Sequence, residues 1–477
     1  MAQRAGTGQP LDRAPIATEY AAIVLLPARE CLFCFSLMGT RRGEKDRIHG
    51  IFAGSPSFFR QGMPPGLGFP VLPPSPTLLP MARKLSLHPK KKEWDQTFQM
   101  MSWWKADEVR AAQVMVVGAG ALGNEVLKNL ALMNVGRILI VDFDRIEYHN
   151  LSRSVLFRES DCEANRLKAD VAAERIREIN PNVKVQTIQG DIMLDVGLGV
   201  FRRMQAVIGC LDNRLARMYI NRHCYKVGRT WIDGGIENLA GQISVYTPDV
   251  SCYECTLSQG DWVNINAKLG CPDVARRNSS QGRVPTTPIS SSIIAAMQVQ
   301  EALKVIHGNH EQSLAGQRFY YEGMSNFIMQ FKLAPLQEDC LAHFPYDPII
   351  EASTLSADRS VGETLAWLNA YFEVEDAAIE LDHEVVLEVA TRKTEQVYEM
   401  VVAKPHLTDK RLRELAVDPG ETVVFTKEVN VLDASFPAPD RKLRELGIPP
   451  LHILRVRAGD DIHFVELTGD EAFLNYT

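Results

Sequence analysis

Three glycines follow a short apolar run in VMVVGAGALG, residues 114–123, with the spacing G-x-G-x-x-G. Glycines at this spacing after a strand let the chain turn tightly and bring backbone N–H groups close to phosphate oxygens at the start of a helix. Gly118, Gly120 and Gly123 are therefore predicted to hold a phosphate group. Asp142 ends the next apolar run, where a carboxylate can bind a ribose. These residues alone fit a redox dinucleotide as well as a nucleotide that is consumed.

A second group of polar residues lies in DFDRIEYHNLSRSVLF, which begins at Asp142. It contains Asp144, Asn150 and Arg153, and Lys168 opens the next predicted helix. An arginine and a lysine near the phosphates suit nucleotidyl transfer, because negative charge builds up on the α-phosphate and on the leaving pyrophosphate. A redox dinucleotide has no comparable need. The residues favour ATP, and an NAD(P)-dependent dehydrogenase is kept only as a distant alternative.

Several motifs in a fixed order resemble the ubiquitin-activating enzyme superfamily, also called the ThiF/MoeB family. They are GAGALGNEVLKNLALMNVGRILIVDFDRIEYHNLSR, LKADVAAERIREINP, GCLDNRLARMYIN and CYEC. The resemblance covers about residues 94–345. Members of that family bind MgATP and adenylate the C-terminal glycine carboxylate of a small ubiquitin-like or sulfur-carrier protein. The resemblance implies the same activity here.

The resemblance also implies a role for each polar residue near the glycines. Asp144 would bind the ribose hydroxyls, Asn150, Arg153 and Lys168 the phosphates, and Asp212 the Mg²⁺ ion, with Asn213 beside it. An ordinary surface or capping role is the alternative for each. Two departures from the family pattern are present: Ser154 replaces a glutamine, and EWDQTFQMM lacks the upstream arginine that reaches the partner subunit's ATP. No such arginine is assigned.

Two residue pairs have metal-ligand spacing. Cys252 and Cys255 form the CYEC motif, and relatives close a structural zinc site with a second C-x-x-C pair downstream. The matching place here reads CLAH, which provides Cys340 and His343. Three thiolates and an imidazole meet the tetrahedral demand of Zn²⁺, so the resemblance implies a structural Cys3His zinc site. Buried free cysteines with a surface histidine are the alternative.

Cys271 is the only thiol in residues 256–288, which are predicted to form a polar crossover loop. In relatives that pass the activated protein onward, this loop carries a nucleophilic cysteine, so Cys271 is predicted to form a thioester. The neighbouring Arg276 and Arg277 could lower the pKa of its thiol. Sulfur-carrier activators also have a cysteine near this loop, so the residue does not separate the two pathways. An inert thiol and an additional metal ligand are the other interpretations.

The elements that must position these residues alternate between strands and helices from about residue 94. Strands are predicted over 113–117, 137–141, 184–188, 206–210 and within 231–246, and helices over 124–133, 168–179 and 290–306. This alternation predicts an α/β fold, with a Rossmann-like, mostly parallel sheet covered by helices on both faces.

Residues 346–477 are predicted to form a separate small α+β domain. The pattern indicates a helix over 361–372, strands over 384–389 and 422–425, and a hairpin in LHILRVRAGDDIHFVEL. The segment has no cysteine, which excludes an active rhodanese. Either it is a ubiquitin-fold-like domain that recruits a conjugating enzyme, or it serves dimerisation or substrate docking.

Composition limits the remaining possibilities. Residues 1–80 hold 11 of the 26 prolines and are predicted to be a disordered arm, and Met81 with the basic stretch after it is a candidate start. The net charge of -7 provides no general attraction to nucleic acid or anionic membranes. No apolar run is long enough to cross a bilayer, and no secretory signal is evident. A cytoplasmic protein with reduced thiols is predicted.

Together these features predict an adenylyltransferase that uses ATP, Mg²⁺ and a structural zinc and works as a homodimer. It would activate a ubiquitin-like protein ending in glycine and pass it from Cys271 to a conjugating enzyme. The alternative is adenylation of a sulfur carrier for cofactor or thiolation chemistry. A non-catalytic scaffold is less consistent with the joint presence of Asp144, Arg153, Lys168 and Asp212.

Overall fold

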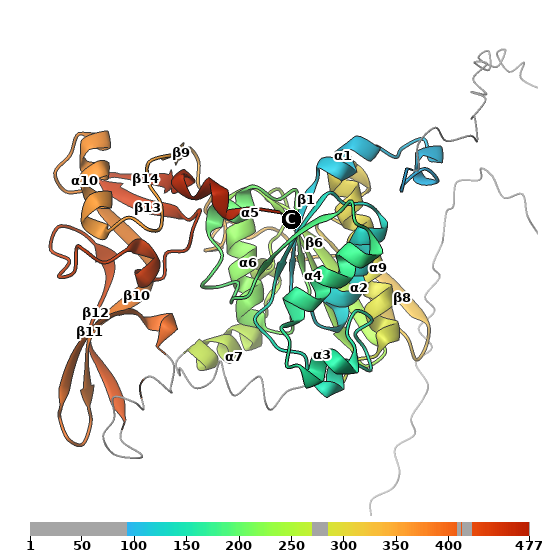
Figure 1. Ribbon diagram of the computed structural model, residues 1–477, viewed down its shortest axis with the longest axis horizontal. Coiled ribbons are helices and arrows are strands. Elements are labelled where there is room, and N and C mark those ends of the chain that lie inside the picture. The colour runs from blue at the N-terminus through green and yellow to red at the C-terminus, as the bar shows by residue number, and fades with distance from the viewer. Residues whose placement is uncertain (1–92, 270–284, 408–411, 413–421, 477) are drawn as a thin grey trace, which may run out of the picture. The chain divides into compact units, whose positions relative to one another are not determined.

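The structure is a computed structural model that describes residues 93–269, 285–407, 412 and 422–476 (Figure 1). All the described residues belong to one compact unit of the chain. The predictions for the proline-rich arm, Met81 and Cys271 with its two arginines lie outside the described residues.

An eight-stranded sheet forms the centre of residues 93–332. Its strand order is β3-β2-β1-β4-β5-β6-β7-β8. The strands are β1 (Gln113–Val117), β2 (Arg137–Val141), β3 (Lys184–Ile188), β4 (Ala206–Gly209), β5 (Thr230–Glu237), β6 (Ala240–Tyr246), β7 (Gln317–Glu322) and β8 (Phe327–Lys332). The first five pair in parallel, and β6 to β8 extend the sheet antiparallel. The predicted Rossmann-like, mostly parallel sheet is confirmed.

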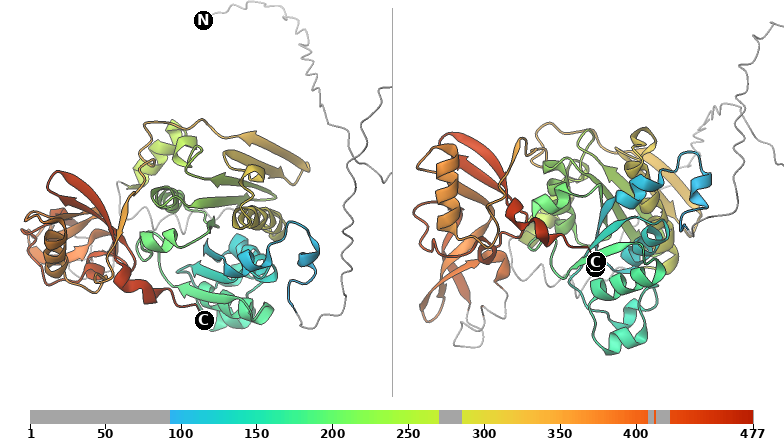
Figure 2. Two further views of the ribbon diagram at one scale, coloured as in Figure 1. Left: turned by 90° about the horizontal axis from the view of Figure 1, so that it is seen from above. Right: turned by 45° about the horizontal axis from the view of Figure 1, so that its top comes forward.

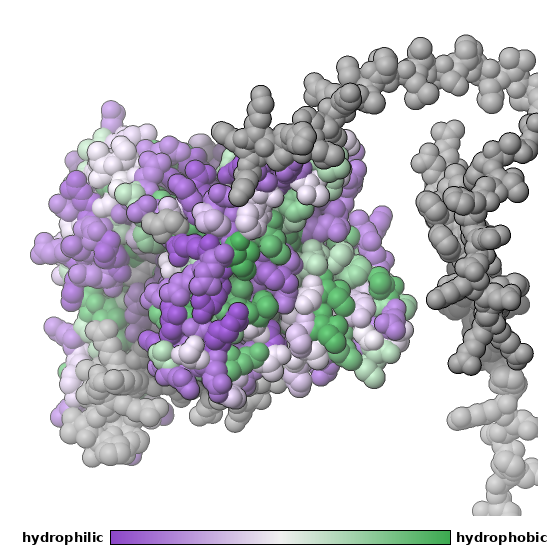
Figure 3. Space-filling view, turned by 45° about the vertical axis from the view of Figure 1, so that its right-hand side comes forward, coloured by the Kyte–Doolittle hydropathy of each residue, from purple (hydrophilic) through white to green (hydrophobic). Residues whose placement is uncertain are grey.

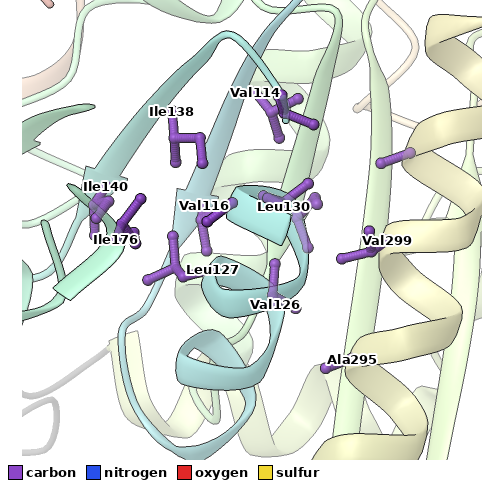
Figure 4. Packing of buried hydrophobic residues seen from close by; sticks show 14 of the residues in the cluster. Val114, Val116, Val126, Leu127, Leu130, Ile138, Ile140, Ile176, Ala295 and Val299 are labelled. Carbon is purple, nitrogen blue, oxygen red and sulfur yellow. The ribbon is translucent and has the colours of Figure 1, made fainter. Parts of the chain in front are cut away.

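Helices cover both faces of this sheet, because successive side chains of a strand point to opposite faces. The helices are α1 (Ala106–Ala111), α2 (Ala121–Leu132), α3 (Glu159–Glu163), α4 (Lys168–Ile179), α5 (Leu198–Arg202), α6 (Arg214–Lys226), α7 (Gln259–Leu269) and α9 (Pro288–Ile306). Val114 and Val116 of β1 pack with α2, α4 and α9 (Figure 4). Met115 and Val117 pack on the other face with α5 and α6.

The structure differs from the sequence expectation in several places. Helix α2 begins at Ala121, three residues early, because Gly120 is its N-cap residue. Helix α7 occupies Gln259–Leu269, within the segment expected to be a crossover loop. Strands β7 and β8 were not predicted, because their residues are all half-buried or exposed, so neither strand shows a buried alternating face.

Hydrophobic side chains reach the surface along β8, where Phe327, Ile328, Met329 and Phe331 are all exposed. Figure 3 shows hydrophobic residues at the surface on the side of the molecule that carries β8. Within the described ranges, every helix is too short or too polar to span a bilayer.

A second, smaller sheet with a helix lies in residues 349–466. Its strands are β9 (Ile349–Glu351), β10 (Ala378–Thr391), β11 (Val397–Ala403), β12 (Val423–Leu432), β13 (Ile453–Ala458) and β14 (Asp461–Glu466). They follow the order β11-β10-β13-β14-β9, and β12 also pairs with β10. Figure 2 shows α10 (Val361–Phe372) lying along this sheet. The predicted terminal hairpin and the helix over 361–372 are confirmed.

Candidate functional site

Three neighbouring strand ends bring most of the predicted site together. In the paired strands, Val117 of β1 lies opposite Val141 of β2 and opposite Gly209 of β4. These strands are parallel, so the chain leaves all three at one edge of the sheet. The glycine loop, Asp142 and the loop that begins at Cys210 therefore meet there, at the edge where ligands bind in open α/β sheets.

Two of the three glycines are required by their surroundings. Gly118 has a φ of +95°, and a Cβ atom there would lie 2.7 Å from the carbonyl oxygen of Cys210. A Cβ atom on Gly123 would lie 1.9 Å from the carbonyl oxygen of Gly118. A Cβ atom on Gly120 would have no atom within 4 Å. Gly120 therefore faces open space, which a phosphate could occupy.

Asp142 has its carboxylate engaged by the backbone. Its two oxygens accept hydrogen bonds from the N–H groups of Ala119, at 2.7 Å, and Asp144, at 2.8 Å. Burial raises the pKa of Asp142 above its usual value, and the charge of Lys168 works against this shift. These bonds join the glycine loop to the end of β2, so the side chain that stays available to a ribose is that of Asp144.

Asp144 and Lys168 form an ion pair, with 2.7 Å between Oδ2 and Nζ. Asp144 is exposed, whereas the lysine is mostly buried. Arg153 is half-buried, and no ion pair or side-chain hydrogen bond joins it to another described residue. Asn150 is buried, and its Oδ1 accepts a hydrogen bond from the N–H of Glu147. The stretch from Asp144 to Lys168 thus carries one paired cation, Lys168, and one uncommitted cation, Arg153.

Asp212 and Asn213 follow β4 on the same edge. Asp212 is exposed and has no hydrogen bond or ion pair to the described part of the chain. Asn213 is the N-cap of α6, and its Oδ1 accepts a 2.9 Å hydrogen bond from the N–H of Leu215. The carboxylate of Asp212 is therefore free to bind a cation, whereas Asn213 also has a capping role.

Polar side chains hold the loop after β4 in place, and the sequence analysis did not identify them. Arg217 donates to the carbonyl oxygens of Leu211, at 2.7 Å, and Gly234, at 3.0 Å, and pairs with buried Asp233. Gln298, wholly buried in α9, donates to the carbonyl oxygen of Gly209 at 2.8 Å. The sequence could have pointed to Gln298, because it lies within an apolar predicted helix and a buried amide needs hydrogen-bond partners.

The four predicted metal ligands come together. Sγ of Cys252 lies 3.7 Å from Sγ of Cys255 and 3.7 Å from Sγ of Cys340, and Sγ of Cys255 lies 3.5 Å from Nε2 of His343. All four ligand atoms lie within 4.8 Å of one another. Zn–S bonds of about 2.3 Å in a tetrahedron place sulfur atoms about 3.8 Å apart. The donor set and its spacing fit Zn²⁺.

The surroundings hold this cluster in place. Buried Glu254, between the first two cysteines, accepts hydrogen bonds from Arg222 and Asn221. The ring of Tyr225 stacks on that of His343 at 4.6 Å. Burial raises the pKa of the Cys252 thiol, a shift that a bound cation would oppose.

A cavity of 350 Å³ lies away from both groups of residues. Trp94, Arg110, Arg137 and Lys184 are among its lining residues. Arg137 and Lys184 begin β2 and β3, so the cavity is at the edge of the sheet opposite the glycine loop. It is not part of the candidate site.

Comparisons with known proteins point to one family. The model of the ThiF family matches residues 97–342. The SUMO-activating enzyme subunit uba-2 of Caenorhabditis elegans is 34% identical over 160 residues, which are 33% of this chain and 27% of that protein. The adenylyltransferase and sulfurtransferase MOCS3 of Culex quinquefasciatus is 29% identical over 236 residues, 49% of this chain and 50% of that protein. The chain thus spans half or less of these relatives' lengths.

A solved structure resembles part of the chain. The structure of E. coli MccB with ATP is 22% identical, with a TM-score of 0.41, and the match covers 50% of this chain and 68% of that one.

Proposed function

Because the chain belongs to the ThiF family, we propose that it uses ATP to adenylate the C-terminal carboxylate of a small protein. Residues 94–345 would be the adenylation domain and residues 346–477 an accessory domain. The meeting of the glycine loop, the Asp144–Lys168 pair and Asp212 at one sheet edge carries the proposal. We place the protein in the cytoplasm.

The residues at this edge can divide the work of nucleotidyl transfer. Backbone N–H groups around Gly120 would hold phosphate oxygens, and Asp144 would bind the ribose. Arg153 and Lys168 would offset the charge that develops on the phosphates, with Asn150 as a further contact. Bound Mg²⁺, held by Asp212, would neutralise phosphate charge.

The adenylation step needs only ATP and the carboxylate of the small protein as reactants. A carboxylate oxygen of the small protein attacks the α-phosphorus of ATP, and the bond from that phosphorus to the oxygen bridging to the β-phosphate breaks. Pyrophosphate leaves, and the carboxylate becomes a mixed anhydride with AMP. AMP is a good leaving group, so the acyl carbon is now open to attack by a nucleophile.

We propose that Cys271 is that nucleophile. Its thiolate would attack the acyl carbon, form a thioester and release AMP. A conjugating enzyme would then accept the small protein, which ends in glycine. A relative named as an activating enzyme supports this proposal. The NEDD8-activating enzyme E1 catalytic subunit of Schizosaccharomyces pombe is 36% identical over 153 residues, which are 31% of this chain.

Adenylation of a sulfur carrier is the second candidate. It is supported by the relatives named as adenylyltransferase and sulfurtransferase, which match 48 to 49% of this chain, more than the activating-enzyme subunits do. In that case the mixed anhydride would react with a sulfur donor, and no thioester on Cys271 would be needed.

We also propose a homodimer with a structural zinc in each subunit. The exposed apolar side chains of β8 support a protein interface, and the ligand spacing at Cys252, Cys255, Cys340 and His343 supports the metal.

ATP–pyrophosphate exchange with candidate small proteins ending in glycine tests the proposal. Exchange should require the small protein and should be lost in Asp212→Ala and Lys168→Ala, which remove charges the reaction needs. Lys184→Ala, at the opposite edge of the sheet, is the matched control and should exchange normally. An active Asp212→Ala would overturn the magnesium assignment.

Non-reducing gels separate the two candidates. A thiol-sensitive adduct that is lost in Cys271→Ala supports conjugation. Exchange without an adduct supports the sulfur-carrier function, and no exchange with any small protein would reject both.

A further inference from the structure

We propose that Asn124 is a positioning residue that sets the distance between the glycine loop and the segment carrying Arg153. The inference rests on the proposed function, because it concerns how the ATP site is held. Asn124 lies in the first turn of α2 and does not face the open edge: its side chain is wholly buried.

The amide of Asn124 bridges two segments about 35 residues apart in the chain. Its Nδ2 donates to the carbonyl oxygens of Ala119, at 2.7 Å, and Gly120, at 3.0 Å. Its Oδ1 accepts from the backbone N–H of Leu156 at 2.9 Å. One side of the amide thus holds the glycine loop, and the other holds the chain three residues after Arg153.

The bridge requires both a donor and an acceptor at this buried position. Asparagine has both on one short side chain. Without it, the carbonyl oxygen of Ala119 and the N–H of Leu156 would lose this partner, whereas the carbonyl oxygen of Gly120 also accepts from the backbone N–H of Asn124 at 2.9 Å. Ser154 adds little, since its buried hydroxyl has no hydrogen-bond partner among the described residues. Leu156 and Phe157 anchor the segment by apolar packing, which does not set its distance from the glycine loop with the same directionality.

The consequence concerns ATP. Phosphate binding would need the backbone N–H groups of the glycine loop and the Arg153 guanidinium at a matched separation, because small errors in placement cost much of the binding energy. Asn124 touches no phosphate in this arrangement. It acts on ATP only by fixing the separation between the loop and Arg153, so its effect depends on the presence of Arg153.

MgATP titrations of the full chain test this inference, with wild type, Asn124→Leu, Arg153→Ala and the double variant. We expect Asn124→Leu and Arg153→Ala each to weaken MgATP binding about tenfold. The double variant should bind about as weakly as Arg153→Ala alone, because Asn124 acts through Arg153. The proposal would be overturned if the two losses of MgATP affinity multiplied in the double variant. It would also be overturned if Asn124→Leu bound MgATP like wild type.

Asn180 provides a matched control. It is also wholly buried, its Nδ2 donates to the carbonyl oxygen of Ala131 and to Oδ1 of Asn134, and its Oδ1 accepts from the N–H of Asn182. Asn180→Leu therefore also removes two donated bonds and one accepted bond, away from the site. It should lower the Tm about as much as Asn124→Leu does, yet leave MgATP affinity unchanged; an equal loss of affinity would reduce Asn124 to a general structural role.

Asn124→Asp decides the matter if Asn124→Leu does not fold. The carboxyl keeps an acceptor for Leu156, but donates to Ala119 only when protonated. Its MgATP affinity relative to wild type should fall at neutral pH and recover as the pH is lowered. A ratio that does not change with pH contradicts the bridge, whereas a wild type that binds no MgATP would remove the proposed function itself.

Discussion

At the scale of single residues, the surroundings decide what each polar or glycine residue can do. Asp142 and Asp144 are two positions apart, yet the first is bound to backbone N–H groups and the second is exposed beside Lys168. Gly120 and Gly123 differ in the same way, since a side chain at Gly123 would strike the backbone and one at Gly120 would meet nothing.

The two glycines therefore predict opposite outcomes. Gly120→Ala should fold with a Tm close to that of wild type, but bind MgATP at least tenfold more weakly, because its methyl group would enter the space for phosphate. Gly123→Ala should lower the Tm strongly or prevent folding. Thermal unfolding and MgATP titration measure both effects. A Gly120→Ala variant with wild-type affinity would show that no phosphate lies there.

At the scale of elements, the metal cluster joins two segments that are 88 residues apart in the chain. The first pair of ligands follows β6 and the second follows β8, in a stretch without helix or strand. Cys252, Cys255 and Ala342 are the buried members of the small apolar cluster between them, Tyr225 and Cys340 pack against it, and Leu341 is 85% exposed. Because this second segment has no helix or strand of its own, a bound metal would add to the stability of the junction.

Removing a ligand should therefore release the metal. Cys340→Ser should reduce zinc from about one ion per chain to well below half an ion, and should lower the Tm, because the segment around residue 340 loses its attachment. Metal analysis of purified protein measures the stoichiometry. Cys224→Ser, a buried thiol outside the cluster, is the control and should keep its zinc. Full zinc in Cys340→Ser would reject the assignment.

At the scale of the molecule, buried polar groups connect the second sheet to the first. Glu466 of β14 is fully buried and pairs with Arg202 and Arg203 at the end of α5. The N–H of Gly199 donates to the carbonyl oxygen of Leu451 at 2.8 Å. His452 follows, and burial lowers its pKa to about 4, an effect that Lys226 reinforces and Asp382 opposes.

The lowered pKa of His452 predicts that acid destabilises the folded protein. The pKa of His452 is lower in the folded chain than the ordinary 6.5, so the unfolded chain takes up the proton first as the pH falls. The contribution of His452 to the free energy of unfolding should be constant above about pH 6.5 and should decrease by up to ~3 kcal/mol as the pH approaches 4.

Urea unfolding between pH 7.5 and 4.5 measures the effect. His452→Gln cannot take up the proton, so its free energy of unfolding should fall less over this range than that of wild type. Identical pH dependence in the two proteins would contradict the prediction.

Much of the fold could be predicted because its strands and helices carry strong local patterns. The strands β1, β2 and β3 and the helix α4 have the predicted bounds, since buried parallel strands are short apolar runs and α4 has one apolar face. Exposed β8 carries no such pattern, and helix α7 lies in a segment that is polar overall.

The sequence by itself determined which residue types are present, their order and their spacing: the glycines, the acidic and basic residues after each strand, and the two metal-ligand pairs. Only the tertiary structure decided which of them remain available. Asp142 and Asn213 have backbone partners, whereas Asp144 and Asp212 are exposed, and Asn124 became visible as a bridge only through its bond to Leu156. The reason is physical: a hydrogen bond between segments far apart in the chain exists only where packing brings its donor and acceptor together, and local patterns do not record that distance.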